Sequence, residues 1–342
     1  MSDEATRIVI IGAGAIGSIA GGYLRRAGRD VHLIDNAPEV VRKINEKGLE
    51  IISHSGWFNI KIQASESITD FLWKPDDFIL LCVKTQHSKE AINQAAAAAS
   101  SETPICCFQN GVQNEIMASQ RFKYVYGGMV LYSGNNLEPG KIFHTEGNYV
   151  GVGVFPSGPP DEKLQSLVQA FKNTSLDIHY VDDLMRAKYT KLLMNMANAP
   201  CAIIGLTEPE LMNLPDARRL FDDLLLESKR VFKAAGIKYD EALLSFKPPD
   251  INSIPRNIPQ ELQAIPSTQQ DVILRRPSTE VDYLNGELVT LGKKYGVPTP
   301  LNELMVKLIH KMTDRGELPG KYLVSDIRNM LDAGCSGEER NR

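Results

Sequence analysis

The sequence predicts an α/β protein of two domains, in which an N-terminal domain built on a parallel sheet precedes an all-helical C-terminal domain. Three observations lead to this expectation. Short apolar runs alternate with helical patterns as far as residue 182, a glycine-rich turn joins the first run to the first helix, and no β-like run follows residue 182.

The predicted strands are short apolar stretches of the kind found in parallel strands that are buried on both faces. They cover residues 8–11, 31–34, 78–83, 104–108, 124–129, 149–154 and 178–181. The segment 91–100 is rich in alanine, which favours a helix. We therefore expect a sheet with helices on both of its faces.

The domain boundary is placed by an acidic pair. Asp182 and Asp183 are suited to a helix start, and a long helical pattern follows them, so the predicted domains are residues 1–182 and 183–342. The helical pattern is interrupted by a proline-rich stretch at 247–266, which we expect to be a loop or an arm. A helical second domain is compatible with a homodimer.

Composition and charge narrow the range of partners. The net charge of −4 comes from interspersed charges of both signs, which gives no electrostatic reason to expect a nucleic-acid partner. No apolar run approaches the length of a membrane span, and residues 1–6 lack the basic and hydrophobic regions of a signal peptide. We expect a cytoplasmic protein without a membrane partner.

The five cysteines form no CxxC pair and no Cys/His cluster, so no metal site is predicted. Cys82, Cys106 and Cys107 lie in apolar, strand-like runs and are interpreted as small buried hydrophobic residues that stay reduced.

The most specific local motif is Gly12-Ala13-Gly14-Ala15-Ile16-Gly17, which lies between the first strand and a helix that ends at Gly28. In a Rossmann dinucleotide-binding unit, the first glycine permits a tight turn, the second lets the pyrophosphate approach, and the third lets helix and strand pack closely. The free N–H groups of the helix start would bind the phosphates. The alternative is a glycine-rich turn in another α/β protein, which the surrounding strand–helix–strand pattern disfavours.

Asp35 follows the second strand, where an acid binds the ribose hydroxyls of the cofactor. A carboxylate there accepts hydrogen bonds from the ribose 2′-OH and repels a 2′-phosphate, which favours NAD(H). The alternatives are that Asp35 is a solvated turn residue, and that the nearby Arg42 and Lys43 receive a phosphate.

The predicted helix at 184–199 carries Lys188, Lys191, Asn195 and Asn198 on one stripe and is apolar on its other faces. Polar groups on a buried helix need partners or a wet cavity, whereas a solvated surface stripe is the alternative. Hydride addition to a ketone leaves an alkoxide that must be protonated, and a buried lysine is a suitable general acid near neutral pH.

Two further polar residues have both a structural and a functional interpretation. Glu280 falls in the first turn of a predicted helix that Thr279 and Asp282 could cap, where it would complement the helix dipole or contact a ligand. Asn110 and Gly111 follow the fourth strand, so they form either an ordinary turn or part of the ligand edge of a parallel sheet.

Taken together, a series of motifs resembles the ketopantoate reductase (2-dehydropantoate 2-reductase) family from about residue 7 to about residue 311. The series consists of the glycine motif, Val83-Lys84-Thr85, Gln109-Asn110-Gly111, 191–195, 267–271 and 279–286. The resemblance implies a Rossmann domain followed by a helical domain like that of 6-phosphogluconate dehydrogenase. It also implies reduction of 2-dehydropantoate to pantoate in pantothenate biosynthesis, usually with NADP(H).

The resemblance further implies roles for single residues, carried over by position. Lys191 matches the proton donor, Asn195 a substrate-binding asparagine, and Ser267 a serine that holds the substrate carboxylate. Glu280 matches a glutamate at the junction of cofactor and substrate, and Asn110 an asparagine that touches both. Lys84 and Ser133 match cofactor contacts.

The chain departs from the family pattern at three places. Ala199 stands where a second asparagine is usual, with Asn198 one residue early and expected to point elsewhere. An asparagine usual further on is replaced around 207–210, and Asp35-Asn36 stands where NADPH-dependent members often have arginine. The alternatives are therefore a reductase of another small 2-oxo acid and a non-catalytic dinucleotide sensor.

Overall fold

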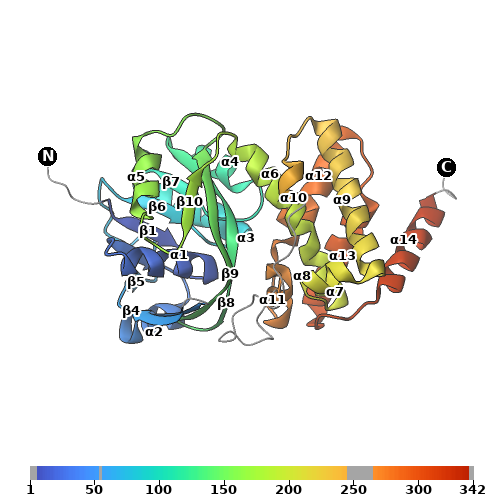
Figure 1. Cartoon of the computed structure of the whole chain (residues 1–342), viewed down its shortest axis with the longest axis horizontal. Coiled ribbons are helices and arrows are strands. Elements are labelled where there is room, and N and C mark those ends of the chain that lie inside the picture. Colours follow the sequence, from blue (N-terminus) through green and yellow to red (C-terminus); the bar gives the residue numbers. More distant parts are fainter. Residues whose placement is uncertain (1–5, 54–55, 245–264, 339–342) are drawn as a thin grey trace. The chain divides into compact units, whose positions relative to one another are not determined.

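The computed structural model describes residues 6–53, 56–244 and 265–338, which fall into two compact units (Figure 1). In the described part of the chain, the first unit runs to Lys188 and the second begins at Tyr189, inside helix α6 (Leu184–Met194). The predicted proline-rich arm lies almost entirely outside the described residues.

The first unit is built on one ten-stranded sheet. Its strands are β1 (Ile8–Ile11), β2 (Val31–Ile34), β3 (Leu49–Ser53), β4 (Gly56–Ile60), β5 (Gln63–Ser65), β6 (Phe78–Leu81), β7 (Ile105–Cys107), β8 (Val125–Glu138), β9 (Lys141–Val154) and β10 (Asp177–Tyr180). The order is β4-β3-β9-β8-β7-β6-β1-β2-β5, with β10 beside β9. The central strands β7, β6, β1 and β2 are parallel, so their carboxyl ends meet at one edge.

Helices cover both faces of the central strands, as predicted. They are α1 (Ala15–Arg26), α2 (Pro38–Lys47), α3 (Thr85–Ala98), α4 (Asn114–Ser119) and α5 (Glu162–Ala170). Alternate residues of β1 enter two different cores: Ile8 and Ile10 pack in the core that includes α1, while Val9 and Ile11 pack in the core that includes α3. Burial on both faces explains why these strands are continuously apolar.

The expectation of a purely parallel sheet is wrong away from this centre. Strands β8 and β9 are antiparallel and extend to a turn at Gly140, where φ is +76°. Polar residues such as Ser133 and Asn135 interrupt the apolar pattern of β8, so the sequence predicted only its first part. Strands β3 to β5 were not predicted. Strand β4 has no continuous apolar pattern because it is a largely exposed edge strand, whose Trp57 is 63% accessible.

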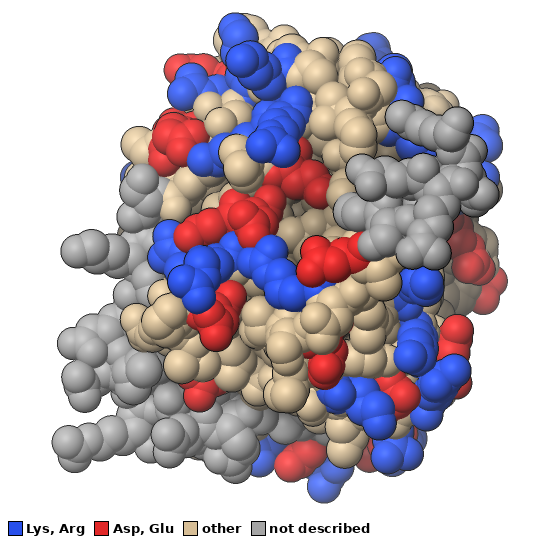
Figure 2. Space-filling view, turned by 90° about the vertical axis from the view of Figure 1, so that its right-hand side faces the viewer, with Lys and Arg blue, Asp and Glu red and all other residues tan. Residues whose placement is uncertain are grey.

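The second unit is entirely helical in the part that the structure describes. Beyond α6 it contains a 3₁₀ turn η1 (Asn195–Ala197), α7 (Asn198–Ile204), α8 (Glu208–Asn213), α9 (Pro215–Ala235), α10 (Glu241–Leu244), α11 (Ser267–Ile273), a 3₁₀ turn η4 (Glu280–Tyr283), α12 (Asn285–Tyr295), α13 (Pro300–Arg315) and α14 (Val324–Glu338). One apolar core joins α7, α9, α11, η4, α13 and α14. On the face of the molecule in Figure 2, positive and negative side chains alternate over the surface.

The single helix predicted at 184–199 is three elements instead, α6, η1 and α7. Pro200 explains the break. It has no N–H to donate to the carbonyl of Met196, and its ring would clash with that carbonyl in a continuous helix. Restarting the helix at Asn198 puts Pro200 in a first turn, where no such bond is needed.

Several smaller expectations can be compared with the described residues. Cys106, Cys107 and Cys201 are buried, Cys82 is partly buried, and burial raises the pKa of all four thiols. No helix within the described ranges has the length and apolar character to cross a membrane. The same ranges contain no group of three or more metal-binding side chains.

Candidate active site

The glycine motif forms the turn from β1 into α1 in the first unit. Gly12 has a φ of +104°, and a Cβ there would lie 2.7 Å from the backbone N of Val83. A Cβ on Gly17 would lie 2.0 Å from the carbonyl oxygen of Gly12. Around Gly14, in contrast, a Cβ would meet nothing within 4 Å. The turn is therefore crowded on its protein side and open beside the start of α1, which leaves space for a pyrophosphate.

Asp35 is attached to this turn. Its Oδ2 accepts a hydrogen bond of 2.8 Å from the N–H of Ala13, and its Oδ1 accepts one of 3.0 Å from the N–H of Ala37. Asp35 is therefore more than a solvated turn residue, because it orders the second residue of the glycine motif. Its carboxylate retains lone pairs for a ribose hydroxyl.

Lys84 and Asn110 follow the neighbouring strands β6 and β7, at the same carboxyl edge as Gly12. Buried polar side chains link the two loops. The Gln109 amide donates to the carbonyl of Val83 at 2.5 Å and to the Ser88 hydroxyl at 2.7 Å. No sequence pattern indicates this link, because glutamine and serine are common in surface loops.

Ser133 lies on β8, and its hydroxyl is 3.0 Å from that of Thr145. Its two neighbours contact helix α1. The Tyr132 hydroxyl donates to the carbonyl of Ile16 at 2.9 Å, and a Cβ on Gly134 would lie 3.5 Å from that of Ala15. The strand segment around Ser133 therefore packs beside the first turn of α1.

The polar stripe on α6 and its continuation is largely buried, which argues against a row of solvated side chains. Lys188 is buried in the first unit, Asn195 and Asn198 are buried in the second, and Lys191 is half-buried. The Nδ2 of Asn195 has no hydrogen-bond partner among the described residues. A buried amide donor without a protein partner is costly, so a ligand or an ordered water is expected to accept its hydrogen bond.

Asn198 does not point away from the other predicted site residues, contrary to our expectation. Its Nδ2 donates to the Oγ of Ser267 at 3.3 Å, which joins α7 to the first residue of α11. Ala199 is buried in the apolar core that also contains Val272 and Val281. These adjacent positions of α7 therefore have different surroundings, with the amide of Asn198 on Ser267 and the methyl group of Ala199 in the core.

Glu208 is a further charged group near Lys191 that the sequence did not indicate. It lies in the first turn of α8, next to Thr207, whose side chain accepts a hydrogen bond from the N–H of Glu210. Desolvation raises the pKa of the Glu208 carboxyl, and the positive charge of Lys191 partly offsets this shift. An acid thus lies near Lys191 in the region where the family asparagine is replaced.

Glu280 is only 4% accessible and lies in the short turn η4 rather than at the start of a long helix. The Thr279 hydroxyl accepts a hydrogen bond from the N–H of Val281, as a cap would, but Asp282 instead lies 3.0 Å from the ring of His310. Because α12 begins only at Asn285, the helix-dipole interpretation of Glu280 loses most of its basis.

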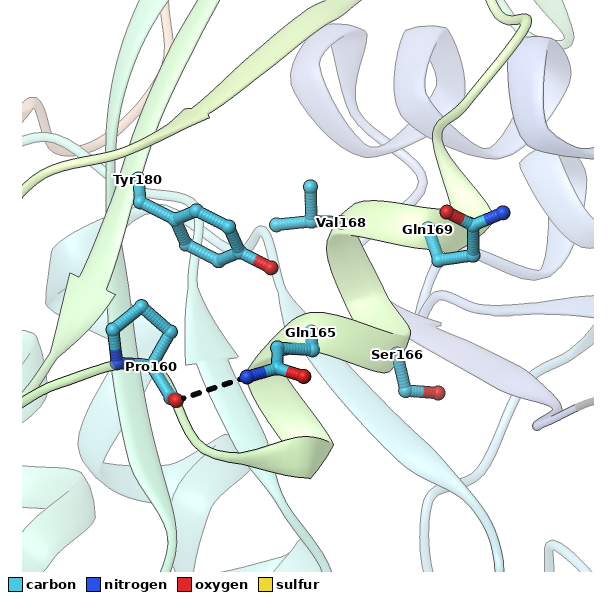
Figure 3. Close-up of a pocket in the computed structure, with 6 residues that line it drawn as sticks. All are labelled: Pro160, Gln165, Ser166, Val168, Gln169 and Tyr180. Atoms are coloured by element: carbon cyan, nitrogen blue, oxygen red, sulfur yellow. Dashed lines mark hydrogen bonds between the residues drawn. The ribbon is translucent and has the colours of Figure 1, made fainter.

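A surface groove elsewhere on the first unit is not part of this site. It is lined by Pro160, Gln165, Ser166, Val168, Gln169 and Tyr180, on and around α5 and at the end of β10 (Figure 3). Strand β10 runs antiparallel to the central strands, and Ser166 contacts Thr6, just before β1. The groove therefore lies at the amino edge of the central strands, opposite the glycine turn.

The parallel centre of the sheet, the glycine turn and the helical unit together define a dehydrogenase-type protein with a nicotinamide dinucleotide cofactor. Comparison with known families agrees. The family described as ketopantoate reductase PanE/ApbA matches residues 8–157, and its C-terminal domain matches residues 183–313. The chain belongs to the ketopantoate reductase family and is an NAD(P)H-dependent oxidoreductase.

Individual relatives are similar over most of their length. The 2-dehydropantoate 2-reductase of Pyrococcus abyssi is 28% identical over 304 residues, which cover 89% of this chain and 96% of that protein. A ketopantoate reductase from Ralstonia eutropha with a known crystal structure is 26% identical, with a TM-score of 0.77, and the match covers 91% of this chain and 99% of that one. The D-mandelate dehydrogenase in a complex with NADH is 25% identical, with a TM-score of 0.75, and the match covers 90% of this chain and 99% of that one.

Proposed function

We propose that this enzyme reduces a small 2-oxo acid to the corresponding 2-hydroxy acid, with 2-dehydropantoate as the first candidate substrate. One observation carries most weight: the buried Asn195 amide lacks a described partner one turn after Lys191, while Asn198 ties the same segment to Ser267. Donors gathered in this way suit a substrate with a carboxylate and a neighbouring carbonyl oxygen. The names of the relatives support the same class of substrate.

The chain's own residues account for the steps other than hydride donation. A nicotinamide dinucleotide, bound at the glycine turn, would supply the hydride. Asn195 and Ser267 would orient the 2-oxo acid, and Glu280 would accept a hydrogen bond from a substrate hydroxyl. As the hydride adds to C2, the carbonyl electron pair moves to oxygen, and the Lys191 ammonium donates its proton to that oxygen. Lys191 then regains a proton from water.

We further propose that the enzyme prefers NADH. The carboxylate of Asp35 is held at the glycine turn by two N–H groups, and it would repel a 2′-phosphate. Arg42 is one of the two cations that could offset this repulsion. Its Nη1 lies 3.4 Å from the Oε2 of Glu46 on the same helix, so its charge is partly balanced there. The D-mandelate dehydrogenase complex with NADH supports the same choice.

A second candidate function is reduction of an aromatic or branched 2-oxo acid. Two observations favour it: Ala199 contributes a methyl group to the core where family members often have an amide, and the D-mandelate dehydrogenase structure is closely similar. The mechanism would be unchanged, because it depends on Lys191 and the carboxylate-binding groups.

One experiment separates these functions. Oxidation of NADH and of NADPH is followed by absorbance with 2-dehydropantoate, phenylglyoxylate and a branched 2-oxo acid as substrates. We expect the highest kcat/KM for 2-dehydropantoate with NADH. A higher kcat/KM for phenylglyoxylate would show that an aromatic 2-oxo acid is the preferred substrate, and the proposed mechanism would still apply. Tight binding of reduced nucleotide without turnover of any oxo acid would contradict the proposal and favour a sensor.

A further inference from the structure

A buried ion pair lies beneath the carboxyl edge of the sheet. The Nζ of Lys188 is 2.8 Å from the Oε1 of Glu115, and the two side chains are 2% and 0% accessible. The Glu115 carboxylate accepts no other hydrogen bond from the described residues. A buried pair of this kind contributes little net stability, so its presence calls for a further explanation.

The ammonium group of Lys188 also holds the main chain next to Asn110. It donates to the carbonyl of Gln109 at 2.6 Å and lies 3.4 Å from the carbonyl of Gly128. With the Glu115 carboxylate at 2.8 Å, the ammonium lies against oxygen atoms of three different residues. Lys188 therefore connects α6 to the loop after β7 and to strand β8.

The next carbonyl along the chain is held from another direction. The carbonyl of Asn110 accepts hydrogen bonds from the Asn114 amide at 2.8 Å and from the Thr85 hydroxyl at 3.2 Å. Both peptide carbonyls at 109 and 110 are thus fixed, and the loop that contains Lys84 is part of the same network. Such a network fixes the position of the side chains that project from it.

The structure also makes room for the acid of this pair. A Cβ on Gly127 would lie 2.5 Å from the Oε1 of Glu115, so a larger residue at this position of β8 would displace the carboxylate from its present place. The pair occupies a site shaped for it, which is unlike an ion pair formed by chance on a surface.

We propose that Lys188 and Glu115 are positioning residues for the reaction. The pair fixes the peptide that carries Asn110 at the cofactor edge and anchors the start of α6, the helix on which Lys191 follows one turn later. This inference rests on the proposed roles of Asn110 and Lys191. Neither member of the pair contacts substrate in this scheme, and both act through those two residues.

The test replaces both charges together, because removing one would leave the other buried and unpaired. Lys188→Met with Glu115→Gln keeps the size of both side chains and removes the bond to the Gln109 carbonyl. We expect cooperative thermal unfolding, a dissociation constant for NADH within about threefold of wild type, and kcat reduced about tenfold or more. Glu115→Gln alone keeps the ammonium on Gln109 but leaves its buried charge unpaired, so it should lower kcat less than the double variant does.

The matched control is Arg218→Met with Asp222→Asn, which removes an exposed 2.8 Å ion pair on α9 and should change nothing. A folded Lys188→Met/Glu115→Gln enzyme with kcat within about twofold of wild type would overturn the proposal. So would a parallel loss of stability, NADH affinity and kcat, because that pattern indicates a purely structural pair. If this variant does not fold, Lys188→Gln with Glu115→Gln is the second variant. The glutamine side chain at position 188 is one bond shorter than lysine and should not reach the Gln109 carbonyl, so the expected results are the same.

Amide hydrogen exchange separates this proposal from the proposed function. If the wild-type protein turns over no oxo acid, the proposed function fails, and exchange at residues 109–114 then decides the positioning role. Faster exchange there in the double variant than in Glu115→Gln supports the role of Lys188. Equal exchange in the two variants overturns it.

Discussion

The amide of Asn198 donates a hydrogen bond to the hydroxyl of Ser267 at 3.3 Å, which connects two helices that are distant in sequence. Both residues lie at the first position of their helix, α7 and α11, and these helices pack against each other. The bond restores an amide near the proposed carboxylate site, although Ala199 occupies the position where the family pattern has one. We regard Asn198 as the residue that takes over this role.

Asn198→Ala should therefore weaken substrate binding more than catalysis. We expect KM for the 2-oxo acid to rise about tenfold with kcat changed less than about threefold, because one hydrogen bond to a charged group contributes roughly 1.5 kcal/mol or more. Steady-state kinetics at saturating reduced cofactor provide the measurement. Asn93→Ala, which removes an exposed amide that binds Arg121, is the control and should leave KM unchanged. An unchanged KM in Asn198→Ala would contradict the assignment.

Lys191→Ala should abolish most of the turnover while leaving cofactor binding intact. Loss of a general acid typically slows the chemical step by a hundredfold or more. We expect kcat to fall by at least about that factor, with the affinity for NADH measured by fluorescence unchanged. Lys233→Ala removes an exposed lysine near the end of α9 and should retain full activity. Near-normal turnover in Lys191→Ala would refute its role as proton donor.

The sequence predicted the central parallel strands and the glycine turn because those features depend on local pattern. Strand β1 is apolar at every position since both of its faces are buried, and Gly12 is needed where the backbone takes a positive φ. Edge strand β4 carried no such pattern. Its Trp57 is exposed, and the strand exists because β3 pairs with it.

The site could be predicted only in part, for a related reason. Asn195 follows Lys191 by four residues, where α6 continues into η1, so their proximity follows from spacing alone. The bond between Asn198 and Ser267, in contrast, depends on how α7 restarts after η1 and on which helix packs beside it. The pairing of Lys188 with Glu115 likewise joins residues far apart in the chain. Tertiary packing of this kind has no local signal.

Asp35→Asn should reduce the preference for NADH. The amide can still accept one of the two N–H bonds that Asp35 receives, so the glycine turn should persist, but the negative charge that repels a 2′-phosphate is removed. We expect the ratio of kcat/KM for NADH to that for NADPH to fall about tenfold, which corresponds to roughly 1.4 kcal/mol. Asp70→Asn, at an exposed acid of the same unit, is the control. An unchanged ratio would show that Asp35 does not select the cofactor.

The last prediction concerns a buried acid that stabilises the helical unit. The Glu227 carboxylate accepts hydrogen bonds from the backbone N–H groups of Leu301 and Asn302 at 3.1 and 2.9 Å and from the Asn302 amide at 2.8 Å, at the first turn of α13. Glu227→Ala leaves these donors unpaired in the core. We expect it to lower the free energy of unfolding by about 2–4 kcal/mol, measured by urea denaturation.

The pH dependence of this contribution has a definite sign. Desolvation raises the pKa of Glu227 in the folded protein, although its hydrogen bonds partly offset the shift. A raised pKa means that the folded state holds the proton more tightly than the unfolded chain does. The protonated carboxyl therefore contributes its full stability at a pH below the pKa of the unfolded chain. This contribution is lost as the pH rises through the pKa of the folded protein. Glu227→Gln has no proton to lose at this site. The free energy of unfolding of the wild type, relative to that of Glu227→Gln, should therefore fall as the pH rises from below about 4.3. If it instead increased with pH, the pKa of Glu227 in the folded protein would be lowered and not raised.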